Sequence, residues 1–271
     1  RRSIMRRKRV LLAYLNTGGG HRSAALAVAE ALEATYGAEL RALPVDVTAE
    51  HFRRPLTELN KTYERLVRGR GRLWALTYHL TNSPRRVRML EPLWWRLTGG
   101  SILNLLAETK PTAVVCCHPL LKAPLAQGLR QGGDQAALIT LVTDLACGHA
   151  TWFHPPDGLC LVPTEDARGH ALACGLAPDS VLVTGLPVGA AFPRAAGLSR
   201  AQARRRLSLT PDAPTVVVIA GADGMGPFEA LLRPLVRGHP SLQVVAIAGR
   251  NERLRKKLAE TAWPRRVHRD S

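Results

Sequence analysis

The sequence predicts an α/β fold in which parallel strands alternate with helices in two successive domains. Short apolar runs bounded by Gly, Pro or Asp alternate with Ala- and Leu-rich stretches of helical spacing. Two of these runs lead into glycine-rich turns, at residues 17–21 and 221–226. Such strand, turn and helix units build doubly wound parallel sheets, which bind ligands at the carboxyl ends of their strands.

The first unit consists of an expected strand at residues 10–15, a helix at 24–36 and a second strand at 39–47. Together they form a βαβ unit, which begins a parallel sheet. The first strand is also too short for a signal-peptide core, because it leads directly into the glycine turn.

The turn after the first strand combines three glycines with a histidine. Gly18, Gly19 and Gly20 carry no side chain, so a ligand can approach main-chain N–H groups, and the following helix adds positive potential. His21 comes next, and an imidazole titrates near neutrality. We therefore predict a site for an anion or a developing oxyanion, with His21 as a candidate general base.

Three other interpretations of this turn differ in how well the residues fit them. A purely structural loop is common in parallel α/β proteins and stays open. A phosphate-binding loop is excluded, because no Gly-Lys-Ser/Thr follows the glycines. A dinucleotide site is weakened because Ser23 stands where the third glycine belongs, although Asp46 ends the next strand where a ribose ligand is expected. An NAD(P)-dependent oxidoreductase therefore stays as a weaker alternative.

Further strands and helices complete the first domain, at residues 1–190. Two polar residues follow strands: His118 after the third and Asp144 after the fourth. Either alone has a plain alternative, His118 as a helix cap and Asp144 as a loop acid. The carboxyl ends of parallel strands meet at one edge, so we expect both near His21. The expected strands are 112–117, 136–143, 158–162 and 180–184, and the expected helices are 119–131 and 165–174.

An insertion at about residues 51–99 differs from the rest of this domain. Between residues 53 and 96 it has eleven basic residues against three acidic ones. Tryptophan beside arginine on amphipathic helices suits the headgroup layer of an anionic membrane. The alternative is that the tryptophans pack inward and the arginines face solvent. The residues predicted to touch the membrane are Arg85, Arg86, Arg88, Trp94, Trp95 and Arg96.

A linker at residues 191–214, with a helix at 200–207, leads to the start of a second domain at 215–271. The expected elements are strands at 215–220 and 242–248 and helices at 227–236 and 251–261. Two parallel strands would leave edges and faces uncovered. We therefore expect this domain to be incomplete, and residues 263–271 to be unrelated to it.

The composition limits the partners and the compartment. The 271 residues carry a formal charge of +17, which favours anionic partners such as a membrane surface. Nucleic acid is disfavoured, because only 5% of the residues are aromatic and no nucleic-acid motif occurs. The five scattered cysteines form no CxxC pair, which indicates a reducing compartment. No apolar run could span a bilayer, so we expect peripheral attachment at a cytoplasmic membrane face without a signal peptide.

Metal binding is also disfavoured. His149 and His154 lie near Asp144, but no third ligand stands at metal spacing. We expect no metal site and no cofactor.

Seven short motifs occur in a characteristic order. Together they resemble the diacylglycerol glycosyltransferases, namely the monogalactosyldiacylglycerol synthases and the processive diacylglycerol glucosyltransferases. These are relatives of the peptidoglycan lipid-intermediate N-acetylglucosaminyltransferase. The motifs are TGGGHR at 17–22, CHP at 117–119, VTD at 142–144, HATWFH at 149–154, PTE at 163–165, GLPV at 185–188 and GMGP at 224–227.

The resemblance implies the GT-B architecture of two Rossmann-like domains, the second one truncated here. It implies inverting transfer of glucose or galactose from a UDP-sugar co-substrate to diacylglycerol or a glycosyl-diacylglycerol, with His21 as the base. The Pro-Gly-Thr segment and following glutamate of the family's donor site have no match. A truncated lipid-binding domain without chemistry is therefore the alternative. The implied donor and loop residues are Gly18, Gly19, Gly20, Gly224 and Gly226, and the acceptor-side residues are His118, Asp144, Trp152, His154 and Pro187.

Overall fold

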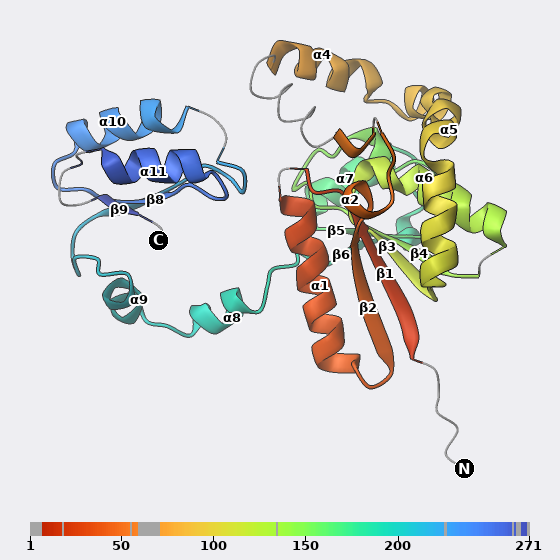
Figure 1. Ribbon diagram of the computed structural model, residues 1–271, viewed down its shortest axis with the longest axis horizontal. Coiled ribbons are helices and arrows are strands. Elements are labelled where there is room, and N and C mark those ends of the chain that lie inside the picture. Colours follow the sequence, from red (N-terminus) through yellow and green to blue (C-terminus); the bar gives the residue numbers. More distant parts are fainter. Residues whose placement is uncertain are drawn as a thin grey trace. The chain divides into compact units, whose positions relative to one another are not determined.

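The computed structural model divides the chain into two compact units, Arg1–Ala190 and Ala191–Ser271. The division falls where the predicted linker begins. Each unit is an α/β structure with a parallel sheet, as the sequence predicts, so the expected fold class is confirmed (Figure 1). The structure describes residues 7–17, 19–54, 56–58, 71–133, 135–224, 227–261, 263 and 267–269.

The first unit contains a six-stranded sheet in the order β2-β1-β3-β4-β5-β6, in which all neighbours are parallel. The chain leaves β1 toward β2 and then returns to the other side of β1, where β3 pairs. The switch point of the sheet therefore lies between β1 and β3. The strands are β1 (Lys8–Tyr14), β2 (Leu40–Asp46), β3 (Ala113–Cys116), β4 (Ala137–Leu141), β5 (Leu159–Val162) and β6 (Val181–Val183).

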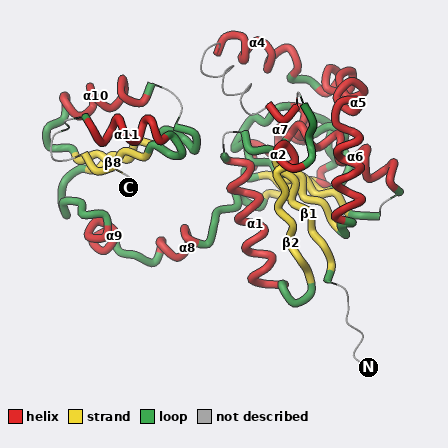
Figure 2. Tube along the Cα trace, in the orientation of Figure 1, coloured by secondary structure: helices red, strands yellow, loops and turns green. Residues whose placement is uncertain are grey.

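Helices connect these strands, and Figure 2 shows them on the outside of the sheet. The α1 helix begins at Gly20, earlier than the predicted start at residue 24, so His21 lies in its first turn. The helices of this unit are α1 (Gly20–Tyr36), α2 (Val47–Glu50), α4 (Gly71–Thr81), α5 (Pro84–Thr109), α6 (Pro119–Gly132) and α7 (Glu165–Ala173), with 3₁₀ turns η1 (Leu56–Glu58), η2 (Ala150–Trp152) and η3 (Pro178–Ser180).

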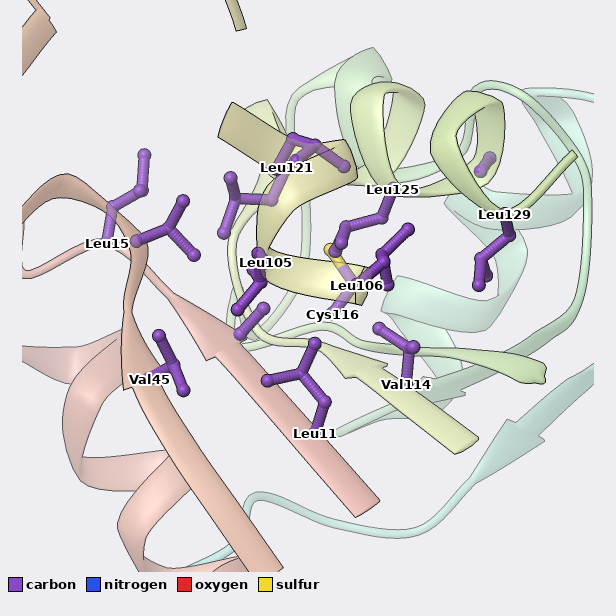
Figure 3. Packing of buried hydrophobic residues seen from close by; sticks show 14 of the residues in the cluster. Leu11, Leu15, Val45, Leu105, Leu106, Val114, Cys116, Leu121, Leu125 and Leu129 are labelled. Atoms are coloured by element: carbon purple, nitrogen blue, oxygen red, sulfur yellow. The ribbon is translucent and has the colours of Figure 1, made fainter. Parts of the chain in front are cut away.

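The two faces of β1 pack against different helices, because successive side chains of a strand point to opposite faces. On one face, Leu12 and Tyr14 pack with the small residues Ala24 and Ala25 of α1. On the other, Leu11 and its neighbours pack with α5 and α6. Figure 3 shows leucines of these two helices gathered over β1 and β3. The sheet is therefore covered on both sides, as a buried parallel sheet requires.

The second unit holds a three-stranded parallel sheet in the order β7-β8-β9. The prediction of only two strands was wrong, since β9 pairs with β8. Trp263 packs against the core of this unit, and its Nε1 donates to the Leu258 carbonyl at 3.0 Å. Trp263 is therefore part of this unit, contrary to the expectation that residues 263–271 are unrelated to it. The elements are α8 (Ala191–Ala196), α9 (Arg200–Arg206), β7 (Thr215–Ile219), α10 (Phe228–Gly238), β8 (Gln243–Ile247), α11 (Glu252–Glu260) and β9 (Val267–Arg269).

Candidate functional site

The carboxyl ends of β1, β3 and β4 bring together four polar side chains. His21 follows β1, in the first turn of α1, and His118 follows β3. Thr143 and Asp144 follow β4. The His21 and His118 ring centroids are 4.4 Å apart, which places both at the switch point of the sheet. Ligands of doubly wound folds bind at this position.

The turn before α1 is shaped by glycine. Gly19 has φ 82° and ψ −21°, a left-handed conformation that residues with side chains rarely adopt. No described side chain caps this end of α1. A Cβ added to Gly20 would meet no atom within 4 Å, so the space beside it is open. The N-terminus of α1 therefore favours negative charge in an accessible place. Gly18 lies outside the described residues.

Neighbours on several sides hold the half-buried ring of His21. Its Nδ1 lies 3.0 Å from Oγ1 of Thr143, at hydrogen-bond distance. The ring meets His118 edge-on and meets Trp152 at a tilt, with centroids 5.8 Å apart in the second case. The orientation of the imidazole is therefore set by residues from three separate segments.

The pKa of His21 is lowered from its ordinary value. Burial is the largest cause, because it disfavours the charged ring. The Asp144 carboxylate and a hydrogen bond with the Cys117 backbone act in the opposite direction and raise this pKa. The net effect keeps His21 neutral at pH 7, and the neutral imidazole is the form that accepts a proton.

His118 is buried and has hydrogen-bond partners at both ring nitrogens. Its Nδ1 accepts the Leu120 backbone N–H at 3.2 Å and so caps α6. Because Nδ1 accepts, the ring proton lies on Nε2, which donates to Oγ1 of Thr17 at 2.9 Å. Burial lowers the pKa of His118 well below its ordinary value, and His21 lowers it further. His118 is thus both the predicted helix cap and a neighbour of His21.

Asp144 is held in place by a buried tryptophan. Nε1 of Trp152 donates to Oδ2 of Asp144 at 2.7 Å, and Trp152 is fully buried. The same indole ring lies against His21. Trp152 therefore fixes a carboxylate near the imidazole, where it stabilises the protonated ring.

The η2 turn is joined to the end of α4. His149 Nδ1 accepts the Thr151 N–H at 3.2 Å, so its Nε2 carries the proton and donates to Oγ1 of Thr81 at 3.0 Å. Oδ1 of Asn82 accepts the Ala150 N–H at 2.8 Å. The turn that carries Trp152 is therefore attached to the inserted helices.

Two predicted acceptor-side residues have other partners than His21 among the described residues. His154 is buried, and its Nε2 lies 3.1 Å from Oε1 of Glu91 on α5. Pro187 follows β6, in a segment that meets α1 through the Ala190 N–H and the Glu30 carboxylate. Among the described residues, no hydrogen bond or ring contact joins Pro187 to His21.

The two tryptophans of α5 pack against the core, which favours the alternative to the prediction that they touch a membrane. Both are half-buried against the core that α5 and α6 share. Trp94 Nε1 donates to the Leu120 carbonyl at 2.8 Å. The Trp95 ring covers Gly99, where an added Cβ would lie 2.7 Å from the ring.

Leucines and arginines form the exposed surface of α5 instead. Met89, Leu93 and Leu97 follow one another at spacings of four residues and are 79%, 60% and 50% exposed, and Leu90 lies beside them. These four residues are called the α5 stripe below. The exposed Arg85, Arg88 and Arg96 flank it by helical position, whereas Arg86 donates to the His79 and Leu80 carbonyls at the end of α4.

The glycine turn of the second unit is closed by its own contacts. Gly224 has φ 58°, and a Cβ there would overlap Asn251 and the Ala248 carbonyl, so only glycine fits. Nδ2 of Asn251 donates to the Gly224 carbonyl at 2.9 Å. Arg250 pairs with Asp223 through Nε and Nη2. Gly226 lies outside the described residues.

Sequence reasoning located His21, His118 and Asp144 but missed Thr17, Thr143 and the contacts of His149. Threonine hydroxyls after strands are common, and only the register of the sheet shows which ones meet a histidine. Within the described ranges, no three His, Cys, Asp or Glu residues are grouped to hold a metal ion. All five cysteines are free thiols. No helix in those ranges is both long and apolar enough to cross a bilayer.

The fold and the site define a doubly wound α/β protein that presents a neutral histidine at the switch point of its larger sheet. Residues 21–188 match the family model described as monogalactosyldiacylglycerol (MGDG) synthase. The chain belongs to the monogalactosyldiacylglycerol synthase family.

Curated relatives match almost the whole chain. The probable monogalactosyldiacylglycerol synthase of Nicotiana tabacum is 32% identical over 94% of this chain and 49% of its own length. The synthase of Spinacia oleracea is 32% identical over 94% of the chain and 50% of its own length. Synthase 1 of Arabidopsis thaliana is also 32% identical, over 95% of this chain and 50% of its own length. The chain thus spans about half the length of these relatives.

Solved structures show a similar fold at low sequence identity. The UDP-N-acetylglucosamine 2-epimerase of Rickettsia bellii has a TM-score of 0.52 and 12% identity, over 98% of this chain and 69% of its own. The S. aureus MnaA-UDP co-structure has a TM-score of 0.51 and 17% identity, over 96% of this chain and 68% of its own. At this identity the comparison shows the fold alone.

Proposed function

We propose that this protein is an inverting glycosyltransferase that moves a hexose from a UDP-sugar to diacylglycerol or to a glycosyl-diacylglycerol. One observation carries the proposal: a neutral His21 lies beside an open, uncapped helix N-terminus at the switch point of the sheet. Family membership supports the reaction class. The relatives' names favour galactose as the hexose and diacylglycerol as the acceptor.

In this reaction His21 is the general base. It takes the proton of the acceptor hydroxyl while that oxygen attacks the anomeric carbon from the face opposite to the leaving UDP. The new C–O bond forms as the bond to UDP breaks, which inverts the anomeric centre. The Asp144 carboxylate stabilises the imidazolium that results. The N-terminus of α1, after Gly19, stabilises negative charge on the departing diphosphate.

The remaining assignments follow from the family. Gly18, Gly20, Gly224 and Gly226 would contribute to the loops beside the donor, and no metal or cofactor is required, because a helix N-terminus and basic groups can balance the diphosphate. His118, Trp152, His154 and Pro187 would form the acceptor side. Of these, His118 and Trp152 contact the His21 ring, which makes them the stronger assignments.

The acceptor is a lipid, so the protein has to reach a membrane surface. We propose that the α5 stripe enters the interface and that Arg85, Arg88 and Arg96 meet anionic headgroups. The attachment would be peripheral, on the cytoplasmic face. The exposed leucines and methionine replace the tryptophans in this role.

A second candidate function is lipid binding without chemistry. The α5 stripe favours it independently of His21. The oxidoreductase alternative is not proposed, because Asp46 is engaged as a helix cap. Its Oδ1 accepts the N–H groups of Thr48 and Ala49 at 3.1 and 3.4 Å.

Transfer of labelled sugar to lipid tests the proposal. Purified chain is incubated with diacylglycerol in anionic liposomes and radiolabelled UDP-galactose or UDP-glucose, and label in the lipid phase is counted. We expect transfer that falls by about 10²–10⁴-fold in His21→Ala, since that is the usual contribution of a general base. His239→Ala, which removes an exposed histidine of the second unit, is the matched control. Liposome binding without any transfer would favour the second candidate.

A further inference from the structure

We propose that Thr143 is the positioning residue of His21: its hydroxyl fixes the orientation of the imidazole by a hydrogen bond to one ring nitrogen, Nδ1. The inference rests on the proposed function, in which His21 is the base. Bases in active sites are commonly held by a third group. The geometry points to Thr143 because its Oγ1 lies 3.0 Å from Nδ1 of His21.

The hydroxyl of Thr143 is itself held in place by its chain neighbours. On one side, Val142 is buried, and its N–H donates to the Leu161 carbonyl at 2.9 Å, which extends the sheet pairing. On the other side, Asp144 is anchored by Trp152. A group that orients another must have a fixed position of its own, and Thr143 lies between two such anchors.

The ring of His21 has little freedom apart from this contact. His118 meets it edge-on, and Trp152 lies against it at an interplanar angle of 48°. These ring contacts limit tilt but do not distinguish the ring from its flipped orientation. A hydrogen bond at Nδ1 does distinguish the two orientations, because the flipped ring would present a carbon, Cδ2, to the Thr143 hydroxyl.

The neighbouring pair of Thr17 and His118 shows the difference between the two histidines. His118 has partners at both ring nitrogens. Nδ1 accepts from the start of α6, and the proton on Nε2 is donated to Thr17, so both nitrogens are used in structural hydrogen bonds. His21 has Thr143 at Nδ1 and a hydrogen bond with the Cys117 backbone, and neither partner is the start of a helix. We therefore assign His118 to structure and the pair of Thr143 and His21 to proton transfer.

Three substitutions test this assignment in the full 271-residue chain. Thr143→Val keeps the shape of the side chain and removes the hydroxyl, whereas Thr143→Ser keeps the hydroxyl. Thr112→Val is the control, because Thr112 is an exposed threonine at the opposite, amino-terminal edge of the same sheet. The readout is the ¹⁵N spectrum of the histidine rings across a pH titration, with His21 assigned by its absence in His21→Ala.

We expect Thr143→Val to change the ring ¹⁵N signals and the pKa of His21, and Thr143→Ser and Thr112→Val to keep both as in the wild type. In the liposome assay, Thr143→Val should lower kcat about tenfold or more with little change in KM, and Thr143→Ser should restore it. An unchanged His21 spectrum in Thr143→Val would overturn the inference. A changed spectrum in a chain without transferase activity would support positioning and contradict the proposed function instead.

Discussion

His118 shows how one side chain can connect the fold to the site. It caps α6 through Nδ1, bonds Thr17 through Nε2 and lies edge-on against His21. The cap requires the neutral ring, because a proton on Nδ1 would remove the acceptor of the Leu120 N–H. Burial lowers the pKa of His118 well below the ordinary value, and His21 lowers it further. The contribution of His118 to the free energy of unfolding should therefore depend on pH.

The prediction concerns His118→Asn and His118→Ala. Between the lowered pKa of the folded state and the ordinary value of 6.5, the unfolded chain binds a proton that the folded chain does not. Stability from this residue is therefore complete above pH 6.5 and lost as the pH falls toward the folded-state pKa. Asparagine keeps a capping oxygen but does not titrate. The stability gap between wild type and His118→Asn should thus narrow from pH 7.5 to pH 5.

Urea unfolding at pH 7.5, 6.5 and 5 measures this gap. At pH 7.5 we expect His118→Asn to lose about 1 kcal/mol with the Thr17 hydrogen bond. His118→Ala should lose about 1 kcal/mol more, because it also removes the cap. Parallel loss of stability in wild type and His118→Asn on acidification would show that His118 is not the residue that titrates.

The residues at strand ends were the part of the site that sequence could predict. His21, His118 and Asp144 each follow an apolar strand, and parallel strands bring such ends to one edge. The pairing of Thr143 with His21 could not be predicted, because it depends on β3 lying between β1 and β4. The sequence pattern gives strands but not their order.

At the scale of elements, α5 packs closely against α6 at positions occupied by glycine. Gly99 is buried under the Trp95 ring, and Gly128 of α6 faces Ile102 and Leu106, whose methyl groups lie 2.8 and 3.0 Å from a Cβ built there. Glycine at these places lets the two helices approach each other. This packing positions the α5 stripe on the opposite side of the same helix.

The adjacent residues Gly99 and Gly100 provide a matched pair for testing this packing. A Cβ at Gly99 would lie 2.7–2.9 Å from three Trp95 ring atoms, whereas a Cβ at Gly100 would meet nothing within 4 Å. Gly100→Ala should stabilise the helix by about 0.5–1 kcal/mol. Gly99→Ala should destabilise by about 1–3 kcal/mol, because the overpacked ring has to move. Chemical denaturation measures both, and equal effects would contradict the packing.

The elements that sequence reasoning missed were those that depend on tertiary contacts. Trp94 and Trp95 have the composition of an interfacial surface, yet the core under α5 accepts them. The strand β9 has three residues, too few for a hydrophobic period, and it forms because β8 offers a free edge. Long periodic elements such as α1 were predicted with small errors at their ends.

For the whole molecule, the charge of +17 and the α5 stripe both favour an anionic lipid surface as the partner. Long-range attraction would bring the protein to an anionic surface, and burial of leucine and methionine would hold it there. Charge alone would attract many polyanions. The stripe adds the requirement for an apolar layer beneath the anionic one, which a lipid surface has.

Vesicle co-sedimentation should separate these two contributions. We expect binding to vesicles with phosphatidylserine that far exceeds binding to phosphatidylcholine vesicles, and that weakens between 0.1 M and 1 M salt as the Debye length falls from about 10 Å to about 3 Å. The double variant Leu93→Ser/Leu97→Ser should bind about tenfold or more weakly at either salt concentration, because each buried leucine contributes about 1.5–3 kcal/mol. Leu231→Ser is the control, since Leu231 is 63% exposed on α10 of the second unit. Equal binding of the stripe variant and this control would mean that charge alone attaches the chain, and the α5 stripe would then have no role at the membrane.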